Sequence, residues 1–234
     1  METEVLTQNL PEKYKVSYLS GSSLWELSLK VNIDSQEYRV KYLQKEKDLI
    51  DFGKGLSERS KDMFCSYPWD NPDKAIPAFR ELINHHKEKR DLAYLIYKDL
   101  DPIGFCFLWG LNGRDELRMP EFGVGIIDSY QGKGIGGFMV DLLTEAANLM
   151  EVDAVELTTD LTNDIAKHLY ESRGYELLGT IKNPLEIDQT KDLSELKNAA
   201  KFREEYHMAR IFRNRENVLT YLKHKREQQN KLFS

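Results

Sequence analysis

The sequence predicts an α+β fold, with a sheet of mixed strand directions in which most strands pair with their neighbours in the chain. Three observations support this. Hairpin-like strands fill the first half, one βαβ unit surrounds a glycine-rich stretch past mid-chain, and two strands, 175–181 and 205–212, come near the end. A doubly wound parallel sheet would alternate strands and helices from its start.

Before the glycine-rich stretch, strands follow from alternating apolar residues and helices from apolar residues spaced three or four apart. The first predicted elements are a hairpin over 14–31 joined by Ser20–Ser23 and a strand at 37–43. Two helices follow: one runs through Leu49, Phe52 and Leu56, and the other begins at Asn71 and has Ile76, Phe79, Leu82 and Ile83 on its apolar side. A hairpin of 92–98 and 103–111 around Asp101-Pro102 and a turn at Asn112-Gly113 complete this half.

After that stretch the same patterns predict a compact alternation of elements. They are a helix carrying Ile135, Phe138, Met139, Leu142, Leu143 and Ala146, a strand at 152–159, a helix at 163–173 ended by Gly174, the strands 175–181 and 205–212, and a helical tail beyond Asn214. The polar connection 182–203 has no assigned role, although long connections of this kind are often functional.

The glycine-rich stretch, Gln131 to Gly137, is the most informative part of the chain. Its four glycines let a ligand approach the backbone, and the helix that follows directs free N–H groups and its positive dipole end toward that ligand. Together these features indicate an anion site, most simply for a phosphate. The chain lacks the G-x-x-x-x-G-K-[ST] string of a P-loop. A dinucleotide fingerprint remains an alternative, because Gly132, Gly134 and Gly137 fit G-x-G-x-x-G.

Around this stretch the chain resembles the GNAT superfamily of N-acetyltransferases. The family's [Q/R]-x-x-G-x-[G/A] loop is matched by Gln131, Gly134 and Gly136, and its preceding strand by Glu121 to Ile126. A second block, an Asn followed seven residues later by Tyr and then a Gly-aromatic pair, is matched from Asn163 to Tyr175. The segment from Glu205 to Arg210 is similar to the family's last strand. The resemblance spans roughly residues 38 to 214.

The resemblance implies a mostly antiparallel central sheet, splayed at a bulged fourth strand and flanked by helices on both faces. It implies an acetyltransferase domain at 38–214, leaving residues 1–37 as an N-terminal extension and 215–234 as a helical tail. Acetyl-CoA would be the cosubstrate. The residues implied to bind it are Val124, Gly125 and Ile126 on the strand, Gln131, Gly132, Lys133, Gly134, Ile135, Gly136 and Gly137 at the loop, and Asn163.

The catalytic residues implied by the resemblance are Tyr170 and Glu121. Tyr170 would protonate the departing CoA thiolate, and Glu121 would help to deprotonate the acceptor amine. Each residue has a simpler interpretation, as a packed ring for Tyr170 and a solvated carboxylate for Glu121. Glu156 and Asp160 lie nearby but out of register with the position at which other family members place a Glu, where this chain has Thr158. Gly123 and Gly125 suit a closely approached strand, or simply close sheet packing.

The leading hypothesis is a cytoplasmic N-acetyltransferase that transfers the acetyl group directly to a primary amine in a ternary complex. The alternatives are a non-catalytic acyl-CoA-binding regulator on the same fold and a dinucleotide-binding protein. The acceptor is not identified. An aromatic group, Phe64, Tyr67 and Trp69, suggests either an acceptor wall or core packing.

Composition excludes several other classes of protein. The net charge is −6, so we expect no nucleic-acid partner, and no apolar run is long enough for a membrane span. Cys65 and Cys106 are expected to be free thiols of a reducing compartment, although one disulfide is an alternative. The five histidines lack the spacing of a zinc site, so we expect no metal. A homodimer is left open.

Overall fold

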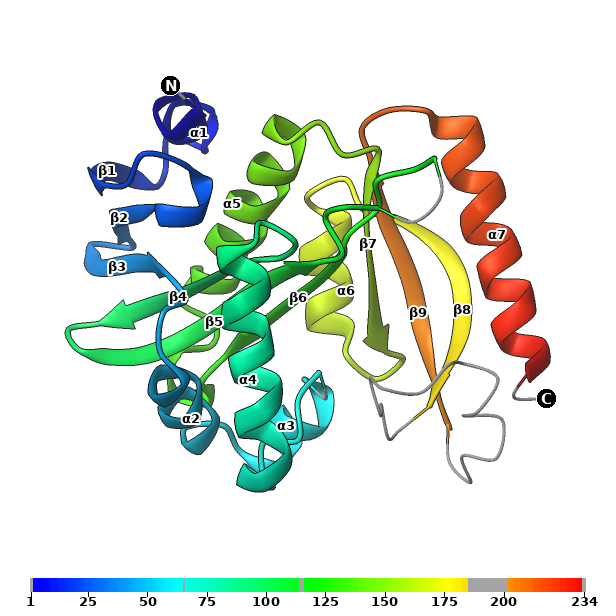
Figure 1. Cartoon of the computed structure of the whole chain (residues 1–234), viewed down its shortest axis with the longest axis horizontal. Helices are drawn as coiled ribbons and strands as arrows, with labels where there is room; N and C mark the ends of the chain where they lie inside the picture. The colour runs from blue at the N-terminus through cyan, green and yellow to red at the C-terminus, as the bar shows by residue number, and fades with distance from the viewer. Residues whose placement is uncertain (1, 65, 114–115, 185–201, 233–234) are drawn as a thin grey trace. The chain divides into compact units, whose positions relative to one another are not determined.

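The computed structural model describes residues 2–64, 66–113, 116–184 and 202–232 (Figure 1). The chain forms two compact units, residues 1–152 and 153–234. Within the described ranges, no helix combines the length and the apolar character needed to cross a membrane.

The first unit is built on strands that pair antiparallel in the order β1-β2-β3-β4-β5-β6. They are β1 (Lys15–Ser20), β2 (Ser28–Ile33), β3 (Gln36–Tyr42), β4 (Leu92–Lys98), β5 (Asp101–Trp109) and β6 (Glu121–Ile126). Its helices are α1 (Glu2–Asn9), α2 (Glu46–Lys54), α3 (Glu58–Met63), α4 (Pro72–Lys87) and α5 (Ile135–Leu149), with single turns η1 (Leu24–Glu26) and η2 (Asp128–Tyr130). This antiparallel order confirms the predicted α+β class and differs from a doubly wound parallel sheet.

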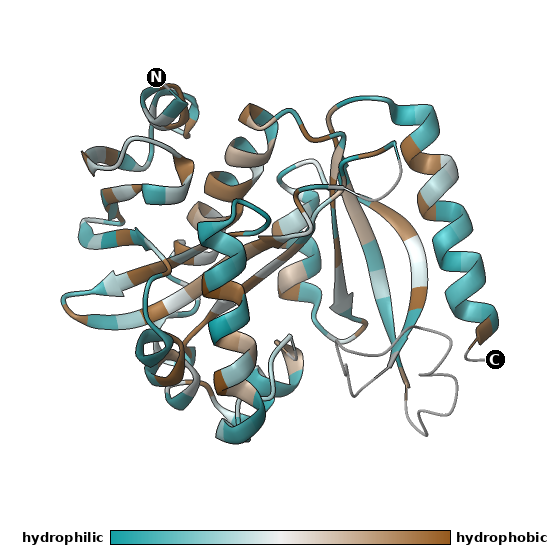
Figure 2. Ribbon diagram, viewed as in Figure 1, coloured by the Kyte–Doolittle hydropathy of each residue, from teal (hydrophilic) through white to brown (hydrophobic). Residues whose placement is uncertain are grey.

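Helices cover both faces of this sheet. On one face, Phe105 and Phe107 of β5 join Phe52 of α2 and Phe79 of α4 in an aromatic core. On the other face, a Cβ placed on Gly104 would lie 3.0 Å from the sulfur of Met139, so α5 packs closely there. Figure 2 shows β4 and β5 as largely hydrophobic strands, as their burial between two helical layers requires.

Residues 1–37 continue the sheet of the first unit. The predicted pairing of β1 with β2 is confirmed, but the expected connection Ser20–Ser23 is too short, because Leu24–Glu26 form η1 and β2 begins at Ser28. A second hairpin joins β2 to β3 through Asp34 and Ser35. Both turn residues have left-handed backbones, with φ of 49° and 66°, which suits the twist of a two-residue hairpin. Tyr14 then contacts α5 twice, donating to Asp141 at 2.9 Å and packing edge-on against Phe138. The expected boundary at residue 38 therefore falls inside β3.

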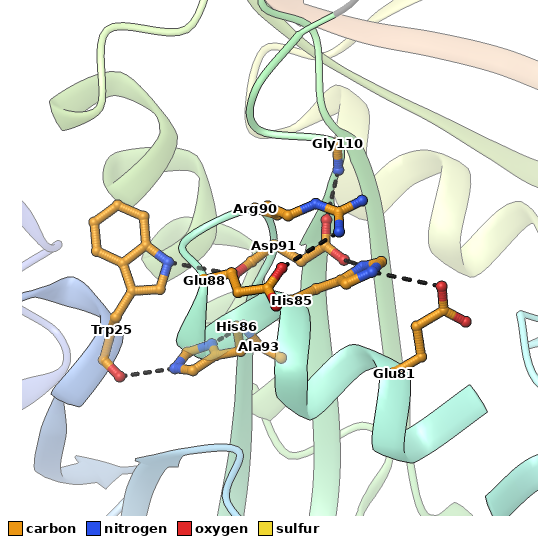
Figure 3. A network of polar contacts seen from close by, with 9 residues as sticks. All are labelled: Trp25, Glu81, His85, His86, Glu88, Arg90, Asp91, Ala93 and Gly110. Carbon is orange, nitrogen blue, oxygen red and sulfur yellow. Dashed lines mark hydrogen bonds and ion pairs between the residues drawn. The ribbon is translucent and has the colours of Figure 1, made fainter. Parts of the chain in front are cut away.

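A polar network fastens the N-terminal segment to the junction of α4 and β4 (Figure 3). The buried ring of His86 accepts a hydrogen bond from the Ala93 N–H at Nδ1 and donates from Nε2 to the Trp25 carbonyl, at 2.7 Å. The Trp25 indole donates to the carbonyl of Asp91, whose carboxylate accepts from the Gly110 N–H. Because burial lowers the pKa of His86, the ring keeps the neutral form that these two hydrogen bonds require.

The second unit is a three-stranded antiparallel arrangement in the order β7-β9-β8. Its strands are β7 (Ala154–Asp160), β8 (Glu176–Pro184) and β9 (Phe202–Ile211), and its helices are α6 (Asp164–Glu171) and α7 (Arg215–Leu232). Helix α7 packs on β8 with Val218 and Leu222 buried, and Figure 2 shows most of its residues as hydrophilic. The predicted helical tail is confirmed, while most of the 182–203 connection lies outside the described residues.

The expected hairpin around Asp101-Pro102 is displaced by two residues. Its turn lies at Asp99 and Leu100, and Pro102 sits within β5 opposite Tyr97. The pairing shifts register between Ile96 and Tyr97, next to that proline. Proline has no N–H to give to a ladder, so it is tolerated where the pairing is already irregular.

Candidate acetyltransferase site

The glycine-rich stretch adopts the geometry of an anion-binding loop. After β6 and η2, Gly132 and Gly134 have φ of 72° and 74°, and Gly134 is the N-cap of α5. Because Gly134 has no side chain, the N-cap residue itself does not cap this helix start. A Cβ placed on Gly132 would meet no heavy atom within 4 Å, so the backbone there borders open space. Lys133 lies beside it, with its ammonium 4.8 Å from the ring centre of Tyr130.

Polar contacts tie this loop to the start of α3. The side-chain amide of Gln131 donates to the Ile126 carbonyl at 3.0 Å and to Ser60 at 3.3 Å. The Asp128 carboxylate accepts from the N–H and hydroxyl of Ser57 and from the hydroxyl of Ser60. Partial burial raises the pKa of Asp128, but these hydrogen bonds outweigh it and leave the pKa lowered. The Gln131 side chain thus braces the loop.

The sequence patterns did not predict these hydrogen bonds between the loop and α3, because the bonded residues lie about 70 positions apart along the chain. Ser57 is also the N-cap of α3, accepting from the Ser60 N–H. The start of α3 and the loop are therefore held as one local structure, since the Ser57 hydroxyl caps α3 and also donates to Asp128.

Strand β6 presents Val124, Gly125 and Ile126 opposite Cys106, Phe105 and Gly104 of β5. The β5–β6 register runs without a shift, so the bulge expected in this strand does not lie in its pairing with β5.

The two β6 glycines have a packing role. A Cβ on Gly123 would lie 2.2 Å from the Phe107 ring, and one on Gly125 would lie 2.5 Å from the Phe64 ring. Close sheet packing therefore accounts for these glycines, and contact of this strand with a cosubstrate stays a prediction.

The aromatic group of Phe64, Tyr67 and Trp69, for which an acceptor wall and core packing were the two alternatives, belongs to the core of the first unit. Phe64 and Tyr67 are buried, and Trp69 packs against Phe52 and Phe79. Burial raises the pKa of the Tyr67 hydroxyl well above its ordinary value, as expected inside such a core. The structure favours the core-packing interpretation of these three residues.

Glu121 begins β6 opposite Trp109 and its side chain is exposed. A carboxylate at this solvent-facing end of the strand is able to exchange protons with water. Its role as a base stays a prediction.

In the second unit, Asn163 and Tyr170 lie on α6 as the motif predicted. Asn163 caps the helix by accepting from the Ala166 N–H at 3.2 Å, so a ligand contact would come from its amide nitrogen. Tyr170 is buried against Tyr175, with ring centres 5.6 Å apart. Burial, and then the neighbouring Tyr175, raise the pKa of Tyr170, so it stays protonated at neutral pH.

The other carboxylates considered as bases have structural partners. Buried Glu156 of β7 is held between Lys225 of α7, at 2.8 Å, and His207 of β9, at 3.1 Å. Burial acts to raise the pKa of Glu156, but Lys225 and His207 lower it to about 2. Asp160 accepts from Thr162 and pairs with Arg203. Neither carboxylate is a good candidate for a general base.

The described residues offer neither a metal site nor a cysteine nucleophile. In them, no group of three or more His, Cys, Asp or Glu side chains is arranged to hold a metal ion. Cys106 is a free, buried thiol whose pKa is raised by burial, which makes it a poor nucleophile. Cys65 lies outside the described residues.

Comparisons with known proteins agree with this architecture. The family model described as "Acetyltransferase (GNAT) family" matches residues 57–175. A search of curated proteins found no match. Among solved structures, Mycobacterium smegmatis RimJ in complex with CoA-disulfide is 14% identical, with 79% of this chain and 86% of that chain covered at a TM-score of 0.59.

Two further solved structures show the same similarity of fold. The GNAT domain of S. lividans PAT is 13% identical, with 82% of this chain and all of that chain covered at a TM-score of 0.60. The spermidine N-acetyltransferase from Vibrio cholerae, in complex with CoA and spermine, is 15% identical, with 74% and 95% covered at a TM-score of 0.56. The chain belongs to the GNAT acetyltransferase family, because the family model spans half of it, including the glycine-rich loop and the Asn163–Tyr175 block.

Proposed function

We propose that the protein is an N-acetyltransferase that moves an acetyl group from acetyl-CoA to a primary amine. The observation that carries the proposal is the loop from Gly132 to Gly137, where the backbone of Gly132 borders open space beside the glycine N-cap of α5. Such a helix start suits the pyrophosphate of CoA. Solved GNAT structures of similar fold contain CoA, which supports the same assignment.

The chemistry follows as one displacement. The neutral amine attacks the thioester carbonyl carbon, a C–N bond forms, and the carbonyl oxygen becomes an oxyanion. A backbone N–H of Val124, Gly125 or Ile126 would stabilise that oxyanion, a contact typically worth about 3–4 kcal/mol. The oxyanion then reforms the carbonyl as the C–S bond breaks, and the thiolate takes the Tyr170 proton. The amine's surplus proton leaves through water or Glu121, and the Tyr170 phenolate regains a proton from water.

Because burial raises the pKa of Tyr170, the phenol is protonated at neutral pH and has a proton to give to the thiolate, although the same burial makes it a weaker acid. Because Glu121 is exposed, water should be able to accept the amine's proton in its place. We therefore expect Tyr170→Phe to reduce kcat more than Glu121→Gln, with a loss of about 10²–10⁴-fold for the tyrosine. Tyr221→Phe on α7 is the matched control.

The test begins with binding of acetyl-CoA by calorimetry, followed by a thiol-release assay with a panel of amines, polyamines and peptide N-termini. Binding with amine-dependent CoA release, lost in Tyr170→Phe, is the expected result. If the protein binds no acetyl-CoA, the proposal is refuted.

A non-catalytic acyl-CoA-binding regulator is the remaining alternative. It would bind acetyl-CoA with the same loop but release no thiol with any amine, and Tyr170→Phe would then leave all measurements unchanged. The antiparallel sheet and the family membership disfavour the dinucleotide alternative. We place the reaction in the cytoplasm, an assignment that the free thiol of Cys106 supports.

A further inference from the structure

The turn between β2 and β3 reaches the glycine-rich loop. A Cβ placed on Gly134 would lie 3.0 Å from the Ile33 side chain and 3.7 Å from a carboxylate oxygen of Asp34. Asp34 therefore holds a negative charge within a few ångströms of the N-cap of α5. This contact lies within the first unit and joins the N-terminal segment, which had no assigned role, to the loop.

A second observation places the Asp34 carboxylate close to Tyr38, a residue that also lies close to Tyr130. The pKa of buried Tyr38 is raised first by burial, then by Tyr130, and then by the charge of Asp34. Tyr130 immediately precedes the loop and has the Lys133 ammonium over its ring. Asp34 and Lys133 thus place opposite charges around the loop.

A carboxylate in this position is favourable while the loop is empty, because the positive end of a helix attracts an anion. When a pyrophosphate binds, the same carboxylate repels it across a short, solvent-exposed distance. This repulsion should weaken the binding only of acetyl donors that carry phosphate groups. Salt should screen the repulsion, since the Debye length is about 8 Å at physiological ionic strength.

We propose that Asp34 sets the affinity of the loop for its anionic donor, opposing the pyrophosphate and promoting release of CoA. This inference rests on the proposed function. It assigns the β2–β3 turn of the N-terminal segment to the donor site as an affinity-determining element, with no part in the chemical step.

The experiment compares Asp34→Asn with the wild-type chain. Asparagine tolerates the left-handed backbone that Asp34 adopts, so the hairpin should be kept. The matched control is Asp99→Asn, since Asp99 is exposed, has φ of 56° and starts the equivalent two-residue turn between β4 and β5. Dissociation constants for acetyl-CoA and for acetyl-pantetheine, which lacks phosphates, are measured at low and high salt.

We expect Asp34→Asn to bind acetyl-CoA about three- to tenfold more tightly at low salt, with the gain largely lost near 0.5 M salt. Affinity for acetyl-pantetheine should stay within twofold, as should acetyl-CoA affinity in Asp99→Asn. Unchanged or weaker acetyl-CoA binding by Asp34→Asn, beside a wild-type chain that binds normally, overturns the inference alone. A wild-type chain that binds no acetyl-CoA overturns the proposed function as well.

Discussion

Replacing Lys225 by Met should strongly destabilise the protein, because it leaves a buried charge without its cation. Glu156 is buried, and its carboxylate lies 2.8 Å from the Lys225 ammonium and 3.1 Å from the His207 ring. Breaking a buried pair by removing one partner typically costs about 3–5 kcal/mol. Burial acts to raise the pKa of Glu156, but Lys225 and His207 together lower it from 4.5 to about 2, which corresponds to about 3 kcal/mol for the two partners combined.

The pH dependence follows from the direction of that shift. A carboxyl whose folded-state pKa is depressed stabilises the fold fully above its unfolded pKa of 4.5. That stability is lost as the pH falls from about 4.5 toward 2. In Lys225→Met most of this contribution should already be missing at pH 7, so its stability should depend less on pH over this acidic interval.

The assay is urea denaturation at pH 7, followed by fluorescence, with Lys223→Met as control. Lys223 lies on the same helix but makes only a surface pair with Glu227, so its replacement should cost less than about 0.5 kcal/mol. If Lys225→Met unfolds within 0.5 kcal/mol of this control, the Glu156 charge is compensated in another way and the argument fails.

Three further predictions concern the glycines and the cap of α6. Gly132→Ala should cost only about 1 kcal/mol in stability, from its left-handed backbone, yet weaken acetyl-CoA binding at least tenfold in calorimetry, because its Cβ enters the open space. Acetyl-CoA binding that stays within about twofold of the wild-type chain would contradict this. Gly125→Ala should lower stability by about 1–3 kcal/mol through overlap with the Phe64 ring, and Phe64→Leu in the same chain should recover part of it. Asn163→Ala should cost about 1 kcal/mol in thermal unfolding, and no change would show that the cap on the Ala166 N–H is dispensable.

Local sequence chemistry predicted much of the fold. Asn71 and Asn163 cap the helices that they were expected to begin, and Gly174 follows α6 with φ of 75°, as a C′ glycine should. The loop glycines were identified from the same physics, because glycine N-caps and left-handed backbones depend on adjacent residues alone.

Features that depend on distant contacts were not predictable in this way. The Glu156–His207 and Glu156–Lys225 contacts join residues 51 and 69 positions apart. The packing role of Gly125 depends on the Phe64 ring, which comes from a different part of the chain. The Asp34-Ser35 turn lacks the glycine that usually marks such turns, so the hairpin it forms was missed.

The way in which β1 and β2 extend the sheet limits how the chain can be shortened. Excising residues 1–37 would make β3 an outer strand with an unpaired row of backbone groups, a known template for aggregation. It would also remove the contacts of Tyr14 with Asp141 and Phe138 of α5, the helix that begins at the loop. A fragment limited to the family-matched residues 57–175 would lose β3 and the end of the second unit as well. Binding and activity measurements on this protein therefore call for a chain that keeps residues 1–37 and the second unit.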